Sequence, residues 1–261
     1  MPLIALGAVI VTLSGCSIRG AGFSAPKSVQ VPSTGISVLR VDAGSGYLRV
    51  VGHEGRGDVV ITGVAQADSR AIVDGERVET RRSGDTLIVT TIIPVSPPGR
   101  FGRVAVALDL MIQLPSGIAL DVVDTSGAAF FRNVGALRIV HGDGRLEADT
   151  VAGSVDITDG NGDILVGFVG GNVHIVDGGG GIHLFRIHGS VDIPKAGNGE
   201  IKLFDVGGDV RVGSKSSGEV VANGIGGSLF VTARGDGSIE YRGVKGRIEI
   251  PPRRDHKDNG A

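Results

Sequence analysis

Aliphatic residues recur along the second half of the chain every 17 to 19 residues. In each repeat two aliphatic positions flank one residue that is nearly always polar, which is the alternation of a strand with one buried face. The first position is occupied by Leu120, Leu137, Val155, Val173, Val191, Val210, Leu229 and Ile248. The second is occupied by Val122, Ile139, Ile157, Ile175, Ile193, Val212, Val231 and Ile250. This pattern predicts stacked units that bury their apolar faces against one another.

A second strand is expected nine residues before each new unit. Its inward positions are Leu146 and Ala148, Ile164 and Val166, Ile182 and Leu184, Ile201 and Leu203, Val220 and Ala222, and Ile239 and Tyr241. One more apolar residue closes each coil: Val151, Val169, Ile187, Val206, Ile225 and Val244. Glycine stands two residues before every new unit, at Gly135, Gly153, Gly171, Gly189, Gly208, Gly227 and Gly246. So regular a glycine predicts either a positive φ or a contact too close for a Cβ.

These patterns predict an all-β fold, a right-handed parallel β-solenoid of 18–19-residue coils with a β-strand-rich N-terminal cap region. A hexapeptide helix is excluded, because Asn161 and Gly167 stand six and twelve residues after Val155. A calcium-binding β-roll is not supported. It would need a ligand aspartate in each coil, and Asp163 has no aspartate at the matching position of the following coils.

The expected organisation has five parts. Residues 1–15 read as a lipoprotein signal peptide, 16–30 as a tether, 31–115 as an N-terminal β region packed on the solenoid, 116–250 as the solenoid repeats and 251–261 as a polar tail. No stretch before residue 115 has a period of 3.6 residues, so no helix is expected there.

The amino terminus combines an apolar run with a cysteine. Residues 3–13 are uncharged and too few to span a bilayer, and Leu13-Ser14-Gly15-Cys16 resembles the lipobox of bacterial lipoproteins. That resemblance implies cleavage before Cys16 and diacylation of its sulfur, and Ser17 favours the outer over the inner membrane. No Lys or Arg precedes the run, so an upstream start or a buried strand with an incidental cysteine stays an alternative.

Composition narrows the choice of partners. The net charge of −2 supplies no field for nucleic acid, and the chain has no Trp and only 10 Phe or Tyr residues. Cys16 is the single cysteine, so an intramolecular disulfide is excluded. No cofactor motif is present, and no cofactor is expected.

Four motifs resemble those of the putative-adhesin family of bacterial β-solenoid domains of unknown function. They are Val41–Gly46 (VDAGSG) before Leu48–Val51 (LRVV), Gly84–Val89 (GDTLIV), and Ile112–Gly117 (IQLPSG), followed by the Gly-x-Gly coils. The resemblance covers residues 35–250. It implies the solenoid fold and an adhesion role, and it implies no catalytic or ligand residues.

Two columns of His and Asp invite a metal hypothesis. His141, Asp159 and Asp177 occupy one column, and Asp156, His174 and Asp192 occupy another; stacked rungs would bring each set close enough to share a cation. The favoured alternative is a solvated ladder of surface charges, so no metal is predicted.

Three phenylalanines form the candidate partner surface. Phe185 and Phe204 share a column in adjacent coils, and Phe168 is near them. If they point outward they form an apolar stripe for a partner, whereas corner aromatics more often tuck under a turn.

The function that these observations favour is a non-enzymatic bacterial envelope lipoprotein, held in the membrane through a lipid on Cys16, that presents the solenoid as a binding or adhesion surface for an envelope protein or glycan. A self-assembling structural solenoid is the first alternative. A polysaccharide-active enzyme is the second, and it would need paired carboxylates in a groove.

Overall fold

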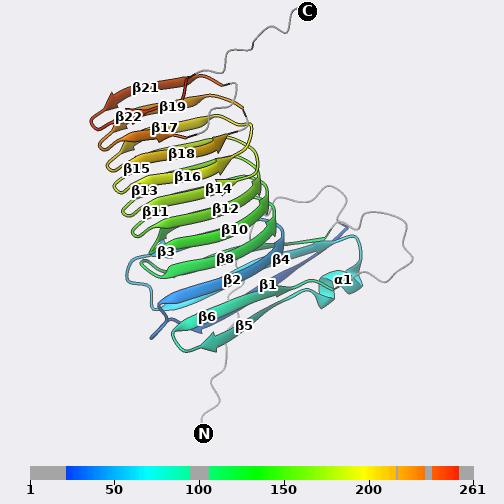
Figure 1. The fold of residues 1–261 in the computed structure, drawn as a ribbon. Coiled ribbons are helices and arrows are strands. Elements are labelled where there is room, and N and C mark those ends of the chain that lie inside the picture. Colours follow the sequence, from blue (N-terminus) through cyan, green and yellow to red (C-terminus); the bar gives the residue numbers. More distant parts are fainter. Residues whose placement is uncertain (1–21, 95–105, 216, 233–236, 253–261) are drawn as a thin grey trace, which may run out of the picture.

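The computed structural model describes residues 22–94, 106–215, 217–232 and 237–252 (Figure 1). Their strands form two 11-stranded sheets, called here sheet A and sheet B. Sheet A contains, in spatial order, β1 (Phe23–Pro32), β4 (Asp58–Ala67), β7 (Val106–Pro115), β3 (Leu48–His53), β9 (Ala129–Val134), β11 (Leu146–Val151), β13 (Ile164–Val169), β15 (Ile182–Ile187), β17 (Ile201–Val206), β19 (Val220–Ile225) and β21 (Ile239–Val244). Sheet B contains β5 (Arg77–Ser83), β6 (Thr86–Ile92), β2 (Val38–Ser45), β8 (Ala119–Ser126), β10 (Leu137–Asp143), β12 (Val155–Asn161), β14 (Val173–Asp177), β16 (Val191–Ala196), β18 (Val210–Lys215), β20 (Leu229–Val231) and β22 (Ile248–Glu249).

The repeat columns are real columns in space. Val155 pairs in parallel with Leu137 on one side and Val173 on the other, and the second strands stack in the same way in sheet A. All three side chains are 1% exposed, because the sheets bury their inward aliphatics in one continuous core. The predicted parallel β-solenoid is therefore confirmed.

The stack continues into the first half of the chain. Strands β2 and β3 form a coil that pairs in parallel with β8 and β9, and β6 and β7 lie beneath that coil. Antiparallel strands then close this end, β4 and β1 on sheet A and β5 on sheet B. Figure 1 shows this wider base at the end of the stack opposite to β21 and β22.

Two expectations for the first half are wrong. Residues 23–30 of the expected tether lie in β1, where alternate side chains such as Ala25 and Val29 pack against the core. Pro26, Lys27 and Ser28 between them hide this alternation in the sequence. Residues Arg70–Gly75 form a helix, α1, which at six residues is too short to show a 3.6-residue period. No helix in the described residues is long and apolar enough to cross a membrane.

Glycines let successive coils approach closely. A Cβ on Gly135, in the column before each new unit, would lie 2.3 Å from the carbonyl oxygen of Gly117 in the coil below. Gly162, in the turn before the second strand, has φ +156° and would place a Cβ 1.8 Å from the Gly144 oxygen. Close approach therefore explains the first glycine column, and a positive φ is an additional demand at Gly162.

Candidate functional site

One corner of the solenoid has an unusual backbone. The residue before the last position of each sheet A strand from β9 to β21 has a φ between 55° and 73°, in the left-handed region. These corner residues are Asn133, Thr150, Phe168, Arg186, Asp205, Gly224 and Gly243. We call this column the left-handed corner.

Glycine would satisfy the backbone at every one of these positions, as it does in β19 and β21. Thr150, Phe168 and Arg186 adopt it at a cost on the order of 1–3 kcal/mol each, because a side chain crowds the backbone there. Strain that recurs in neighbouring coils is a reason to look for a function of those side chains.

The side chains and backbone of the left-handed corner line a groove of about 810 Å³. It extends from Asn133 to Lys245, along the direction in which the coils stack. Phe168 is 44% exposed, and the Arg186 guanidinium lies 4.9 Å from its ring centroid. The groove thus offers an aromatic face, cationic groups and the polar backbone of glycine turns.

The three predicted phenylalanines meet beside this groove. The Phe185 ring lies over Gly167, whose missing side chain leaves it room, since a Cβ there would be 2.2 Å from the Phe185 Cζ. Its ring packs edge-to-face against Phe168 with centroids 5.4 Å apart. Phe204 pairs beside Phe185 and is 39% exposed. Burial under a turn is therefore wrong for Phe168 and Phe204, and their use by a partner stays a prediction.

The first of the two His and Asp columns lies inside the core. Asp124, His141, Asp159 and Asp177 stack in register and are 1–4% exposed, so a solvated surface ladder is the wrong interpretation for this column. The reason is the alternation of the strand: His141 follows Leu137 and Ile139 at a spacing of two and faces inward with them. We call these four residues the buried ladder.

Hydrogen-bond geometry gives His141 a positive charge. Its Nδ1 lies 2.6 Å from Asp159 Oδ1 and its Nε2 3.1 Å from the Gly127 carbonyl oxygen, so both ring nitrogens face acceptors. Asp124 Oδ2 is 3.4 Å from Nε2. Burial alone would lower the pKa of His141, but the nearby carboxylate of Asp124 and the hydrogen bonds to Asp159 and Gly127 outweigh it and raise that pKa to about 10.

Burial shifts the pKa of two carboxyls of the buried ladder upward, whereas its effect on the pKa of His141 alone is downward. Burial raises the pKa of Asp159, and the hydrogen bond from His141 only partly offsets this. Burial also raises the pKa of Asp177, which accepts hydrogen bonds from the backbone N–H groups of Gly179 and Gly197. Among the described residues no set of three or more His, Cys, Asp or Glu side chains is placed to hold a metal ion. The hydrogen bonds of this column are those of a buried ladder that holds a proton on His141.

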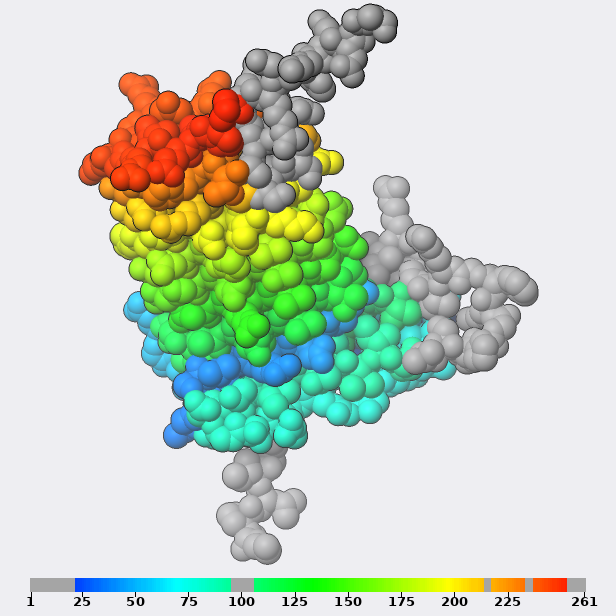
Figure 2. Space-filling view, viewed as in Figure 1, coloured from blue at the N-terminus to red at the C-terminus, as the bar shows by residue number. Residues whose placement is uncertain are grey.

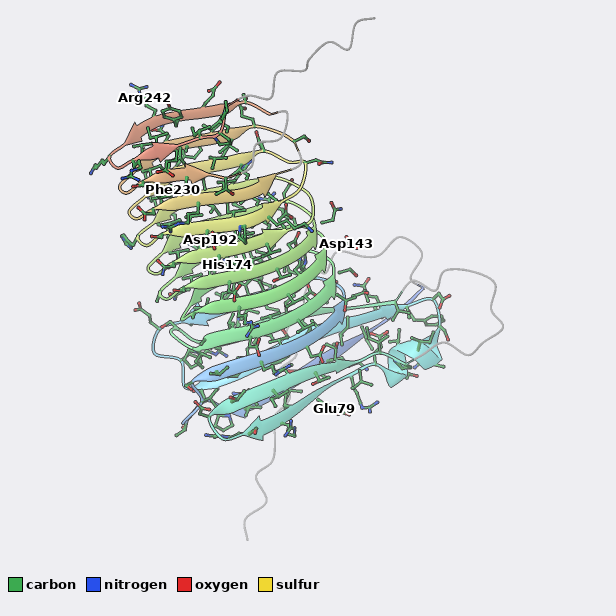
Figure 3. All side chains as sticks on the ribbon, viewed as in Figure 1. Glu79, Asp143, His174, Asp192, Phe230 and Arg242 are labelled. Carbon is green, nitrogen blue, oxygen red and sulfur yellow. The ribbon has the colours of Figure 1, made fainter. Side chains whose placement is uncertain are left out.

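The second column of charges is a surface feature. His174 Nδ1 lies 3.1 Å from Asp192 Oδ2 on the outer face of sheet B, and the two side chains are 43% and 50% exposed (Figure 3). Here the solvated ladder is the right interpretation.

A second hollow of about 470 Å³ lies at the opposite corner, before the sheet A strands. His183 Nε2 and Lys202 Nζ lie 2.8 Å and 2.7 Å from the two oxygens of Glu200 there. Hydrogen bonds from Lys202 and His183 lower the pKa of Glu200. Since these charges already satisfy one another, this hollow has less to offer a ligand than the corner groove.

The molecule is thus a two-sheet parallel β-solenoid with an antiparallel base and a groove along one corner.

No family model and no curated protein sequence matches the chain. Several solved structures are similar to it, among them three bacterial proteins. A putative cell adhesion protein from Clostridium sporogenes is 12% identical with a TM-score of 0.37, covering 87% of this chain and 99% of its own. A putative lipid binding protein from Parabacteroides distasonis is 15% identical with a TM-score of 0.45, covering 85% and 96%. A putative adhesin from Bacteroides fragilis is 16% identical with a TM-score of 0.36, covering 88% and 98%.

Proposed function

We propose that this protein is a non-enzymatic bacterial envelope lipoprotein that binds an envelope glycan or protein along the left-handed corner. One observation carries the proposal: bulky and charged side chains occupy strained corner positions that glycine fills in the last two coils, and those side chains line the groove. The adhesin names of the similar structures agree with a binding role.

The shape of the groove favours an extended partner. The coils repeat about every 4.8 Å, so the groove presents the same corner geometry again and again along its length. A linear polymer lying along it would meet Phe168, Arg186 and Lys245 in turn. Aromatic and arginine side chains are the groups that most often dominate binding energy at such surfaces.

The lining does not support catalysis on a polysaccharide. Hydrolysis of a glycosidic bond uses two carboxyl groups that flank the bond. Asp205 is the one carboxylate that lines the corner groove among the described residues. The buried ladder holds more carboxyls, but it lies inside the core.

The anchor is proposed from Cys16, which lies outside the described residues, and Ser17 favours the outer membrane. Metabolic labelling with a fatty-acid analogue tests it. We expect the wild-type chain to take up label and the Cys16→Ala variant to lose it. An unlabelled wild-type chain would remove the lipid anchor from the proposal.

Binding through the groove is tested with Phe168→Asn and Arg186→Asn. Asparagine tolerates a positive φ and already stands at Asn133 in the same column, so the fold should be kept. We expect the double variant to bind isolated cell envelopes at least tenfold more weakly than wild type, since exposed hot-spot side chains contribute ~1–3 kcal/mol each.

The matched control is Val140→Asn, because Val140 is 46% exposed on sheet B, on the other face of the solenoid. It should bind envelopes like the wild type. Treating the envelopes with protease or with lysozyme then tells a protein partner from a glycan. Equal binding by the groove variant and the wild type would contradict the proposed site.

A further inference from the structure

The last coil exposes residues that belong to core columns. Tyr241 stacks on Ala222 and Ile248 stacks on Leu229, and both of these partners are fully buried. Tyr241 is nevertheless 50% exposed and Ile248 39% exposed, because no further coil covers them in the described residues. Figure 2 shows this end of the molecule as the outer layer of the stack.

The two ends of the solenoid are built differently. Among the described residues the outermost strand of each sheet pairs with one strand at either end, but the base ends in the antiparallel strands β1 and β5, whereas β21 and β22 continue the parallel stack and end it with an edge that no antiparallel strand covers. A free edge of this kind can accept another strand. Residues 253–261, which follow β22, read RRDHKDNGA and contain no apolar residue larger than alanine, so they are poorly suited to replace an apolar layer.

The charges on the outermost sheet A strand are complementary to themselves. In β21 the exposed Tyr241 stands between Glu240 and Arg242. If a strand pairs antiparallel with its own copy about its central residue, each acid faces a base of the partner. Figure 3 labels Arg242 on this outermost coil.

We propose that the β21–β22 end pairs with the same end of a second copy of this chain. A two-fold axis normal to sheet A that passes beside Tyr241 sets β21 antiparallel against the partner's β21. Tyr241 then meets the partner's Tyr241, so that each supplies the missing apolar neighbour of the other.

This pairing is closed. A two-fold contact uses the same patch on both copies, so it makes a dimer and no filament. The chain enters the described structure at β1, at the end opposite to the contact (Figure 1). If the proposed anchor on Cys16 holds, the paired tips lie away from the membrane, and two opposed membranes could each contribute one copy. This last consequence rests on the proposed function, and the dimer itself does not.

The first experiment reverses charges at the contact. The full chain carrying Cys16→Ser, which has neither lipid nor thiol, is studied by sedimentation velocity over a range of concentrations. We expect a monomer–dimer equilibrium that Arg242→Glu weakens about tenfold or more, because Glu240 then faces a like charge. The double change Glu240→Arg with Arg242→Glu restores the complementarity and should restore the dimer. Arg138→Glu, an exposed change in a middle coil, should leave the dimer unaltered.

The second experiment locates the axis. Residues directly opposed in an antiparallel pair have Cα atoms ~4.5–5.5 Å apart, which is within the range for a disulfide. Tyr241→Cys in the Cys16→Ser chain should therefore form a disulfide-linked dimer on mild oxidation, and Val221→Cys in the preceding coil should not. A chain that stays monomeric at every concentration and forms no Tyr241→Cys disulfide would overturn the proposal. Open-ended filaments, or a dimer that forms only after residues 253–261 are removed, would overturn it too.

Discussion

Replacing His141 by alanine should lower the free energy of unfolding by about 3–5 kcal/mol. The imidazolium lies between Asp124 and Asp159 in a column that is almost fully buried. Removing it leaves two carboxyl groups in the core without their cation, and Asp124 Oδ2 and Asp159 Oδ2 already have no hydrogen-bond donor. Urea unfolding followed by circular dichroism measures the loss.

The exposed column supplies the matched control. His174→Ala removes a His–Asp pair of similar geometry, 3.1 Å against 2.6 Å, but from the surface. We expect it to cost less than about 1 kcal/mol, because water replaces the lost partner. Replacing Asp124, His141 and Asp159 together by leucine should recover much of the stability lost in His141→Ala, since apolar residues can substitute for a buried ion pair. Equal losses in His141→Ala and His174→Ala would contradict the buried ladder.

Raising the pH should destabilise the wild-type protein through the same ladder. The folded-state pKa of His141 is about 10 and its ordinary value is 6.5, so the stabilisation by its proton is complete below pH 6.5 and is lost as the pH rises through 10. Burial also raises the pKa of Asp159 and Asp177. Their protons therefore stabilise the fold at low pH, and this stabilisation too is lost as the pH rises. We therefore expect the contribution of the buried ladder to the free energy of unfolding to fall toward alkaline pH and not to fall toward acid.

The size of the alkaline effect follows from the shift. Each pKa unit is worth ~1.4 kcal/mol, so the loss between pH 6.5 and 10.5 is on the order of 3–5 kcal/mol. Lysines and tyrosines also titrate in this range, and the triple leucine variant serves as the reference that contains them but not the ladder. The free energy of unfolding of the wild type, relative to that of the triple leucine variant, should fall as the pH rises. A relative value that stays constant, or that falls toward acid, would show that His141 is not held as the cation.

The sequence predicted the regular part of the fold because its signal is repeated. Leu137, Val155 and Val173 each repeat one alternation, and stacking them needs no knowledge of long-range contacts. The coil formed by β2 and β3 was harder to recognise, since β4 to β7 interrupt it before β8 and β9 pair with it. Its position in the stack is set by pairing across residues 54–118, which no local period reveals.

Side-chain direction was the main error at the candidate sites. A solvated ladder is the expectation for His141 and Asp159, although extending the alternation from Ile139 by two residues places His141 inside. Arg186 and Asp205 were not predicted as groove residues. A signal existed, because Gly224 and Gly243 occupy the same column and point to a left-handed backbone there. Which side of a corner is hollow depends on the packing of adjacent coils and could not be read from the chain.

Photo-crosslinking in living cells tests the binding surface most directly. A benzoylphenylalanine is placed either at Phe204, beside the corner groove, or at Val140 on the outer face of sheet B, positions that are 39% and 46% exposed. If the left-handed corner binds an envelope partner, irradiation should give a high-mass adduct from position 204 and none from position 140. Adducts of equal yield from both positions, or an adduct from position 140 alone, would contradict the account.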